Sequence, residues 1–79
     1  MKATVLVRPK AGILDPQGRA VESSLRQLGF SVGEARVGRV IDLEVNAASA
    51  DEARGEIERM CERLLANPLI ESYEIEVET

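Results

Sequence analysis

The spacing of the apolar residues switches between two periods along the chain, and the order of these switches restricts the fold more than any other feature. Period two, typical of a β-strand with one covered face, runs through 2–8, 30–47 and 73–78. A period of about 3.6, typical of an amphipathic helix, runs through 16–28 and 50–65. The chain is therefore predicted to alternate strands with two helices.

The segment 30–47 is interpreted as a hairpin. Its apolar positions change parity near Gly33, so a bulge is expected there. Gly38-Arg39 is predicted as a two-residue type II′ turn, because glycine adopts the positive φ of its first position. The element order is then β-α-β-β-α-β. It predicts an α+β two-layer sandwich, with a mostly antiparallel sheet and both helices on one face.

A chain of 79 residues is expected to form a single domain, residues 1–79. A domain of this size buries only about 60% of the surface that its unfolded chain exposes, so self-association would add stability. The sheet face without helices has apolar positions at Leu6, Val40 and Leu69 or Ile70. We therefore expect a homo-oligomer, a dimer or a tetramer, to form through this face.

Local signals mark the ends of both helices. Asp15 followed by Pro16 predicts a helix start, because the carboxylate accepts free N–H groups and proline fits the first helical position. Gly29 is predicted to close that helix in a left-handed conformation. Ser49–Glu52 reads S-A-D-E, a capping box that starts the second helix, and Asn67-Pro68 ends it.

Charge and hydropathy exclude two classes of partner. A formal net charge of −4 argues against nucleic acid, since phosphate binding needs a surplus of Lys and Arg. No apolar run approaches the roughly 18 residues of a membrane span. The N-terminus lacks the layout of a signal peptide. The expected location is cytoplasmic.

The composition offers little for catalysis. There is no histidine, and Cys61 is the only cysteine. Cys61 falls on the apolar stripe of the second helix, so a buried structural thiol is expected rather than a nucleophile. Neither G-x-x-x-x-G-K-[ST] nor G-x-G-x-x-G occurs. We expect no catalytic, cofactor-binding or metal-binding residue in this chain.

Other function classes stay open on this reasoning. Gly12 and Gly18 flank a helix N-terminus with Arg8, Lys10 and Arg19 nearby, a composition compatible with an anion site. Exposed basic side chains are nevertheless ordinary. A small-molecule-binding regulatory module would also fit the predicted architecture. Acylphosphatases share the element order, but this sequence lacks their glycine-valine-glutamine-glycine loop.

Three stretches together resemble one known family. "KAGILDPQGRAVESSLRQLGF" is similar to the start of the small PurS-type subunit of phosphoribosylformylglycinamidine (FGAM) synthase. "EARVGRVIDLEV" resembles its middle, where Lys or Arg follows a glycine, and "CERLLANPLIESYEIEV" resembles its closing segment. The resemblance covers nearly the whole chain in one register.

This resemblance implies a function in purine biosynthesis. The complex converts formylglycinamide ribonucleotide to formylglycinamidine ribonucleotide with glutamine and ATP. A glutaminase releases ammonia, and a large ATP-using synthase subunit consumes it; ATP and Mg are implied for the complex, not for this chain. The small subunit would be non-catalytic, would bridge the other two and would assist ammonia transfer.

The resemblance also supplies candidate partner contacts. They lie in the DPQG junction and in the segment after the second helix: Asp15, Pro16, Gln17, Gly18, Asn67, Pro68 and Glu71. Gly18 has two explanations, because glycine early in a helix weakens it unless another backbone comes close. That backbone belongs either to a partner subunit or to this chain. If it belongs to a partner, Gly18→Ala would slightly stabilise the isolated chain.

Overall fold

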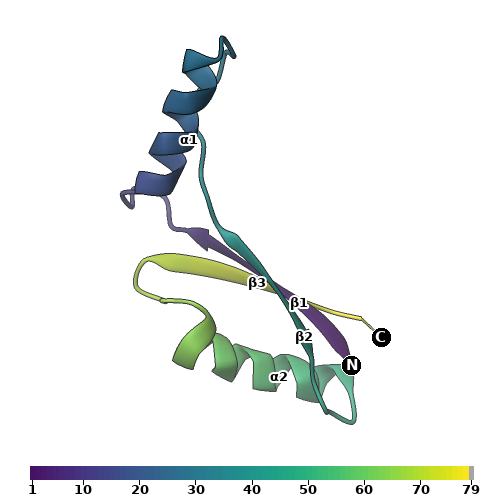
Figure 1. Ribbon diagram of the computed structural model, residues 1–79. Helices are drawn as coiled ribbons and strands as arrows, with labels where there is room; N and C mark the ends of the chain where they lie inside the picture. Colours follow the sequence, from purple (N-terminus) through teal and green to yellow (C-terminus); the bar gives the residue numbers. More distant parts are fainter. Residues whose placement is uncertain (79) are drawn as a thin grey trace.

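The computed structural model describes residues 1–78 (Figure 1), so the expected domain 1–79 extends by Thr79 beyond the described residues. Three strands and two helices alternate, and the second helix continues into a π-helical turn, η1. Within the described part of the chain, no helix has the length and apolar character needed to cross a membrane. The bounds are β1 Lys2–Pro9, α1 Pro16–Gln27, β2 Arg39–Glu44, α2 Ala50–Met60, η1 Cys61–Leu65 and β3 Glu71–Val77.

The three strands form one antiparallel sheet in the order β2-β1-β3, which confirms the α+β class and the antiparallel sheet. β1 is central, and its Val5 pairs with Ile41 of β2 and with Ile75 of β3. Alternate side chains of a strand face opposite sides of the sheet. Ala3, Val5 and Val7 therefore share one face of β1, and all three are buried.

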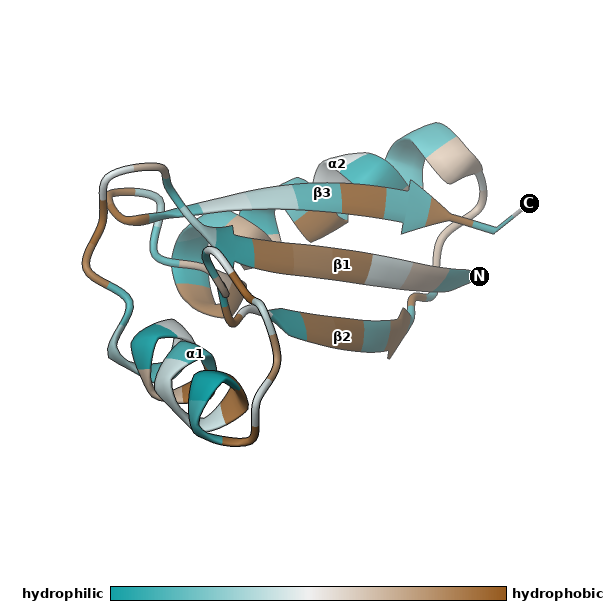
Figure 2. Cartoon of the chain, turned by 90° about the horizontal axis from the view of Figure 1, so that it is seen from above, coloured by the Kyte–Doolittle hydropathy of each residue, from teal (hydrophilic) through white to brown (hydrophobic). Residues whose placement is uncertain are grey.

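α2 and η1 cover this buried face, and Figure 2 shows α2 lying along the strands. Ser49 caps α2 by accepting the Glu52 N–H at 3.2 Å, as the capping pattern predicts. The apolar stripe of α2 and η1 then brings Ala53, Ile57 and Cys61 to complete burial. The core is thus a single contact layer between one helix and three strands.

The predicted hairpin is wrong in its first half. Residues 31–38 form no strand, and the only strand of the segment 30–47 is β2. In this return segment, residues 31–38, hydrogen bonds to side chains take the place of a strand ladder. Arg26 donates to the carbonyls of Val32, at 3.1 Å, and Gly33, while Asp15 accepts the Val37 N–H at 2.9 Å.

Gly38 is correspondingly not a turn residue. It has no positive φ, and a Cβ at this position would collide with the Val7 carbonyl of β1. Glycine is therefore needed at Gly38 for a close backbone approach where the return segment joins the sheet. The type II′ turn prediction mistook this steric requirement for a conformational one.

α1 has the predicted limits but a different place. Asp15 caps it, Pro16 is its first residue, and Gly29 closes it at φ 97°. The helix projects past the end of the sheet instead of lying on the face that α2 covers (Figures 1 and 2). The resulting radius of gyration is 15.7 Å, compared with about 12 Å for a compact chain of this length.

Candidate functional site

The two segments singled out in the sequence, 12–18 and 67–71, lie at the same end of the sheet. β1 leads into the first, and the antiparallel β3 starts from the second, so the topology brings them together. The Lys10 N–H, just before the first segment, donates to the Ile70 carbonyl of the second at 2.9 Å. Side chains of both line a groove of about 410 Å³. We call this the junction surface, and it comprises Ile13, Leu14, Asp15, Gln17, Ile70 and Glu71.

Asp15 connects the start of α1 to the return segment. One carboxylate oxygen, Oδ1, accepts the Gly18 N–H at 3.0 Å, and the other, Oδ2, accepts the Val37 N–H at 2.9 Å. Hydrogen bonds to an ionised carboxylate stabilise the charged form. The Val37 N–H, followed by the Gly18 N–H, therefore lowers the pKa of Asp15. Both bonds are internal, so Asp15 has a structural role whatever else it contacts.

Gly18 meets a backbone of its own chain. It is the one buried residue of α1, and its φ is not positive. A Cβ there would collide with the Ala35 carbonyl and with the Asp15 carboxylate. The expected close backbone is thus the return segment, and no partner is needed to explain the glycine. The expectation that Gly18→Ala stabilises the isolated chain is contradicted by this geometry.

The turn after α2 is a hydrogen-bonded unit. The Asn67 carbonyl accepts the N–H groups of Ile70 at 3.1 Å and Glu71 at 2.7 Å, and Asn67 Oδ1 accepts the Leu69 N–H at 3.1 Å. The Pro68 carbonyl accepts Lys10 Nζ at 2.7 Å. Asn67 and Pro68 therefore shape a turn that leaves Leu69 84% exposed.

Sequence reasoning missed the residue that anchors this turn, Arg39. Its Nη1 lies 2.8 Å from Glu71 Oε2, its Nη2 lies 3.1 Å from Glu71 Oε1, and Nη2 also donates to the Leu65 carbonyl at 2.6 Å. This pairing, with the Asn67 N–H bonded to the same carboxylate, lowers the pKa of Glu71. Arg39 was interpreted as a turn residue, so its reach across the sheet was overlooked. Its signal was a positive charge at the start of one strand and a negative charge at the start of another.

Exposed apolar side chains surround these fixed polar groups. Leu14 is 68% exposed, Ile70 is 42% exposed and Ile13 is 37% exposed. Pro16 and Gln17 are exposed as well, and Gln17 lines the groove while Pro16 does not. Exposed apolar side chains beside satisfied polar groups are typical of protein-binding surfaces.

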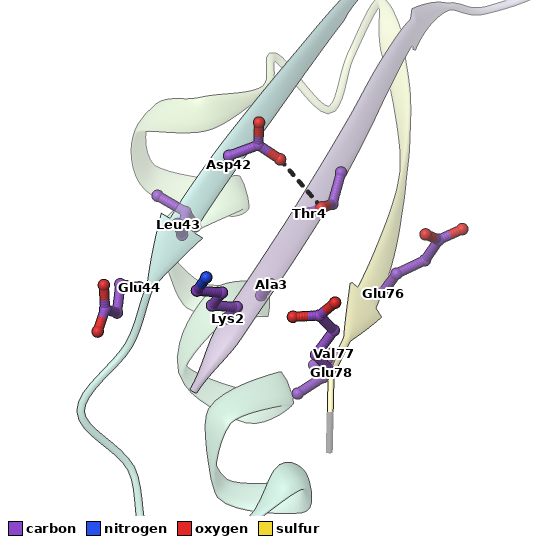
Figure 3. Close-up of a pocket in the computed structure, with 9 residues that line it drawn as sticks. All are labelled: Lys2, Ala3, Thr4, Asp42, Leu43, Glu44, Glu76, Val77 and Glu78. Carbon is purple, nitrogen blue, oxygen red and sulfur yellow. Dashed lines mark hydrogen bonds between the residues drawn. The ribbon is translucent and has the colours of Figure 1, made fainter.

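The opposite end of the sheet is acidic. Figure 3 shows Asp42 and Glu44 of β2, and Glu76 and Glu78 from the β3 side, flanking Lys2 of β1. Thr4 donates to Asp42 at 3.0 Å. Among residues 1–78, no group of three or more acidic, Cys or His side chains is arranged to hold a metal ion. The carboxylates at this end form a solvated face, as predicted for the last strand.

Cys61 lies in the core, as predicted, with no exposed surface. Burial raises the pKa of its thiol, which opposes formation of a thiolate. Nearby, Tyr73 donates to Glu62 at 2.8 Å, and this bond raises the pKa of Tyr73 to about 12. Neither group is activated for chemistry.

Comparison with known proteins gives one consistent result. The family model described as phosphoribosylformylglycinamidine (FGAM) synthase, PurS, matches residues 2–79. The PurS subunit of FGAM synthase from Methanocaldococcus jannaschii is 42% identical over 98% of this chain and 94% of its own length. The structure of B. subtilis PurS has a TM-score of 0.87 at 38% identity, covering 99% of this chain and 98% of that chain.

A third relative is part of an assembly. The structure described as PurLQS from Thermotoga maritima contains a chain that is 36% identical, with a TM-score of 0.86. The match covers 95% of this chain and 93% of that chain. Because the family model spans nearly the whole sequence and the fold agrees at high identity, this chain belongs to the PurS family.

Proposed function

We propose that this chain is the small, non-catalytic subunit of FGAM synthase in purine biosynthesis, and that it bridges the glutaminase and the ATP-dependent synthase. The observation that supports this most directly is the kinship with a chain of the PurLQS assembly, where three kinds of subunit occur together. The site chemistry is consistent with such a role. Asp15 and Glu71 are both committed to internal hydrogen bonds, and the Cys61 thiol is sheltered.

The junction surface is the proposed contact with the larger subunits. Partner binding draws most of its free energy from a few desolvated side chains in well-ordered surroundings. Leu14 and Ile70 offer that apolar area, and the bonds of Asp15 and Glu71 fix the backbone beneath them. The candidate contacts Pro16, Asn67 and Pro68 border the same region.

Self-association is the second part of the proposal. On the sheet face away from α2, Val40 is 62% exposed, next to Leu6 of β1. The apolar stripe of α1 leaves Val21 41% exposed, and Leu28, at the helix C-cap, is 74% exposed. A chain with two such uncovered surfaces and a small core gains stability from a second copy.

The proposed contribution to ammonia transfer follows from this bridging role. Ammonia made by one subunit must reach another without escaping to solvent, and a subunit that fixes their relative position shortens that path. In this proposal the chain binds neither ATP nor Mg itself. The complex carries both.

The test is reconstitution with the glutaminase and the synthase. Leu14→Lys places a charge in the junction surface and should reduce glutamine-driven synthesis and co-purification of both partners. Leu64→Lys is the matched control, because Leu64 is 82% exposed and does not line the groove. Equal behaviour of the two variants would contradict the proposed contact. A metabolite that stabilises the isolated chain in a thermal-shift screen would instead favour a regulatory module.

A further inference from the structure

The side chain of Arg39 joins three elements that the backbone leaves separate. Arg39 begins β2, an edge strand, and Glu71 begins β3 on the opposite edge, with β1 between them. Two parallel N–H···O contacts, at 2.8 and 3.1 Å, connect their side chains. The same guanidinium reaches the Leu65 carbonyl at the end of η1, at 2.6 Å. A fork of this kind fixes direction as well as distance.

Glu71 passes this restraint on to the turn. Its Oε1, already bonded to Arg39, also accepts the Asn67 N–H at 2.7 Å, and its own N–H donates to the Asn67 carbonyl at 2.7 Å. The Glu71 side chain is only 17% exposed, while that of Arg39 is 48% exposed. A mostly buried carboxylate that accepts three hydrogen bonds has little freedom to rotate. The conformation of residues 67–70 is therefore coupled to the position of the Arg39 guanidinium.

This coupling matters for the junction surface. Both Arg39 and Glu71 line its groove, together with Ile70 from the turn and Leu14 from the first segment. A surface loop that is ordered before binding loses less conformational entropy when the partner arrives. Without the Arg39 fork, Glu71 would keep the Asn67 bonds but lose its fixed place relative to β2.

We propose that Arg39 is a positioning residue, which holds the turn 67–70 against the segment 12–18 and so preorganises the junction surface for the larger subunits. This inference rests on the proposed function. Arg39 acts through Glu71 and need not touch the partner itself. The salt bridge is not proposed as a source of stability, because partly exposed ion pairs contribute little to folding.

Affinity for the partner subunits is the decisive measurement. Arg39→Gln removes the charge and the fork, and should weaken binding on the order of tenfold. Arg39→Lys keeps the charge without the fork and should fall in between. Arg54→Gln is the matched control, because Arg54 also bridges two elements, donating to the Ile75 carbonyl at 3.0 Å, but does not line the groove. It should bind normally.

Two further readouts separate positioning from folding. Amide hydrogen exchange at Leu69 and Ile70 should speed up in Arg39→Gln, while exchange in the β1 core stays slow. In the reconstituted complex, the concentration of this subunit needed for half-maximal glutamine-driven synthesis should rise about tenfold, with an unchanged plateau. A merely unfolded variant would instead exchange quickly in the β1 core as well.

The outcomes distinguish this inference from the proposed function. If Leu14→Lys binds its partners normally, the junction surface is not the docking site and both fail. If Leu14→Lys is impaired while Arg39→Gln behaves like Arg54→Gln, only the positioning role is overturned. If Arg39→Gln does not fold, Arg39→Lys carries the test. Weaker binding than wild type supports the role, and equal binding overturns it.

Discussion

The two helices have similar amphipathic patterns and opposite surroundings. In α2 the apolar stripe packs against the sheet, and Ala53 and Ile57 have no exposed surface. In α1 the corresponding stripe is left uncovered, with Val21 41% exposed and Leu28, at the helix C-cap, 74% exposed. An apolar stripe thus shows that a helix has a face to bury, but not which surface will bury it. In α1 that face is available to another chain.

The difference is made at the helix starts. α2 follows β2 through a short connection and turns straight back onto the sheet that β2 belongs to. α1 leaves the end of β1, and Asp15 and Arg26 then bind the return segment alongside it. These side-chain bonds make α1 and residues 31–38 a small unit of their own, outside the core.

The largest expected difference is in the free energy of unfolding, between a side-chain truncation in the core at α2 and one at the surface at α1. Ile57→Ala should lower the free energy of unfolding by about 2–5 kcal/mol, because it empties a fully buried site. Leu28→Ala should change the free energy of unfolding of the dissociated chain by no more than about 0.5 kcal/mol. Urea denaturation at low protein concentration measures both. A large loss for Leu28→Ala at that concentration would mean that α1 packs on its own sheet.

The sequence predicts the regular elements of this fold better than the segment that side chains hold in place. Where an element has a regular apolar face, the local pattern was enough to predict it: the strands near 2–8 and 73–78 and both helices with their caps agree with the structure, although the pattern did not place α1. The segment 30–37 failed because its alternating apolar residues imitate a strand while its backbone bonds go to Asp15 and Arg26. Such long-range side-chain bonds leave no periodic signal.

The candidate site shows the same limit. Asp15, Gln17 and Glu71 were singled out by resemblance, and the structure places all three around one groove. Arg39 was missed because its importance depends on where β3 begins, 32 residues along the chain. Gly18 was recognised as unusual, but only the structure shows that the backbone pressing on it is internal. Whether these residues contact a partner stays a prediction.

The next effect in size concerns Gly18, where α1 is held to the return segment. Gly18→Ala should destabilise the isolated chain by about 1–3 kcal/mol, because its Cβ would overlap the Ala35 carbonyl, which is backbone and cannot rotate away. Thermal unfolding with hydrogen exchange at residues 31–38 measures the loss and locates it. If exchange quickens in the return segment and not in β1, the α1 unit opens separately from the core. An unchanged or raised melting temperature would mean that the segment moves aside easily.

A smaller effect is expected from the ionisation of Asp15. Its pKa is lower in the folded chain than its usual value of about 3.9, because the N–H groups of Val37 and Gly18 stabilise the carboxylate. The stabilisation is therefore present above pH 4 and is lost as the pH falls through the folded pKa. Asp15→Asn should be less stable than wild type at pH 7, and the gap should narrow towards pH 2. Melting temperatures of both proteins across that range test this, and the titration of Glu71 is common to the two. A constant difference in melting temperature between wild type and Asp15→Asn would contradict the prediction.

The smallest expected effect is that of Gly55→Ala in α2, which can be compared with Gly18→Ala in α1. Gly55 lies in mid-helix, has no positive φ, and a Cβ added there would meet nothing within 4 Å. Gly55→Ala should therefore stabilise the isolated chain by up to about 1 kcal/mol, through the higher helix propensity of alanine. The opposite sign from Gly18→Ala would show that space, not helix position, decides the effect of the same substitution. If Gly55→Ala stabilises the isolated chain yet weakens self-association or partner binding, another chain packs closely against α2 at Gly55. Normal assembly would leave α1 and the open sheet face as the surfaces that a second copy covers.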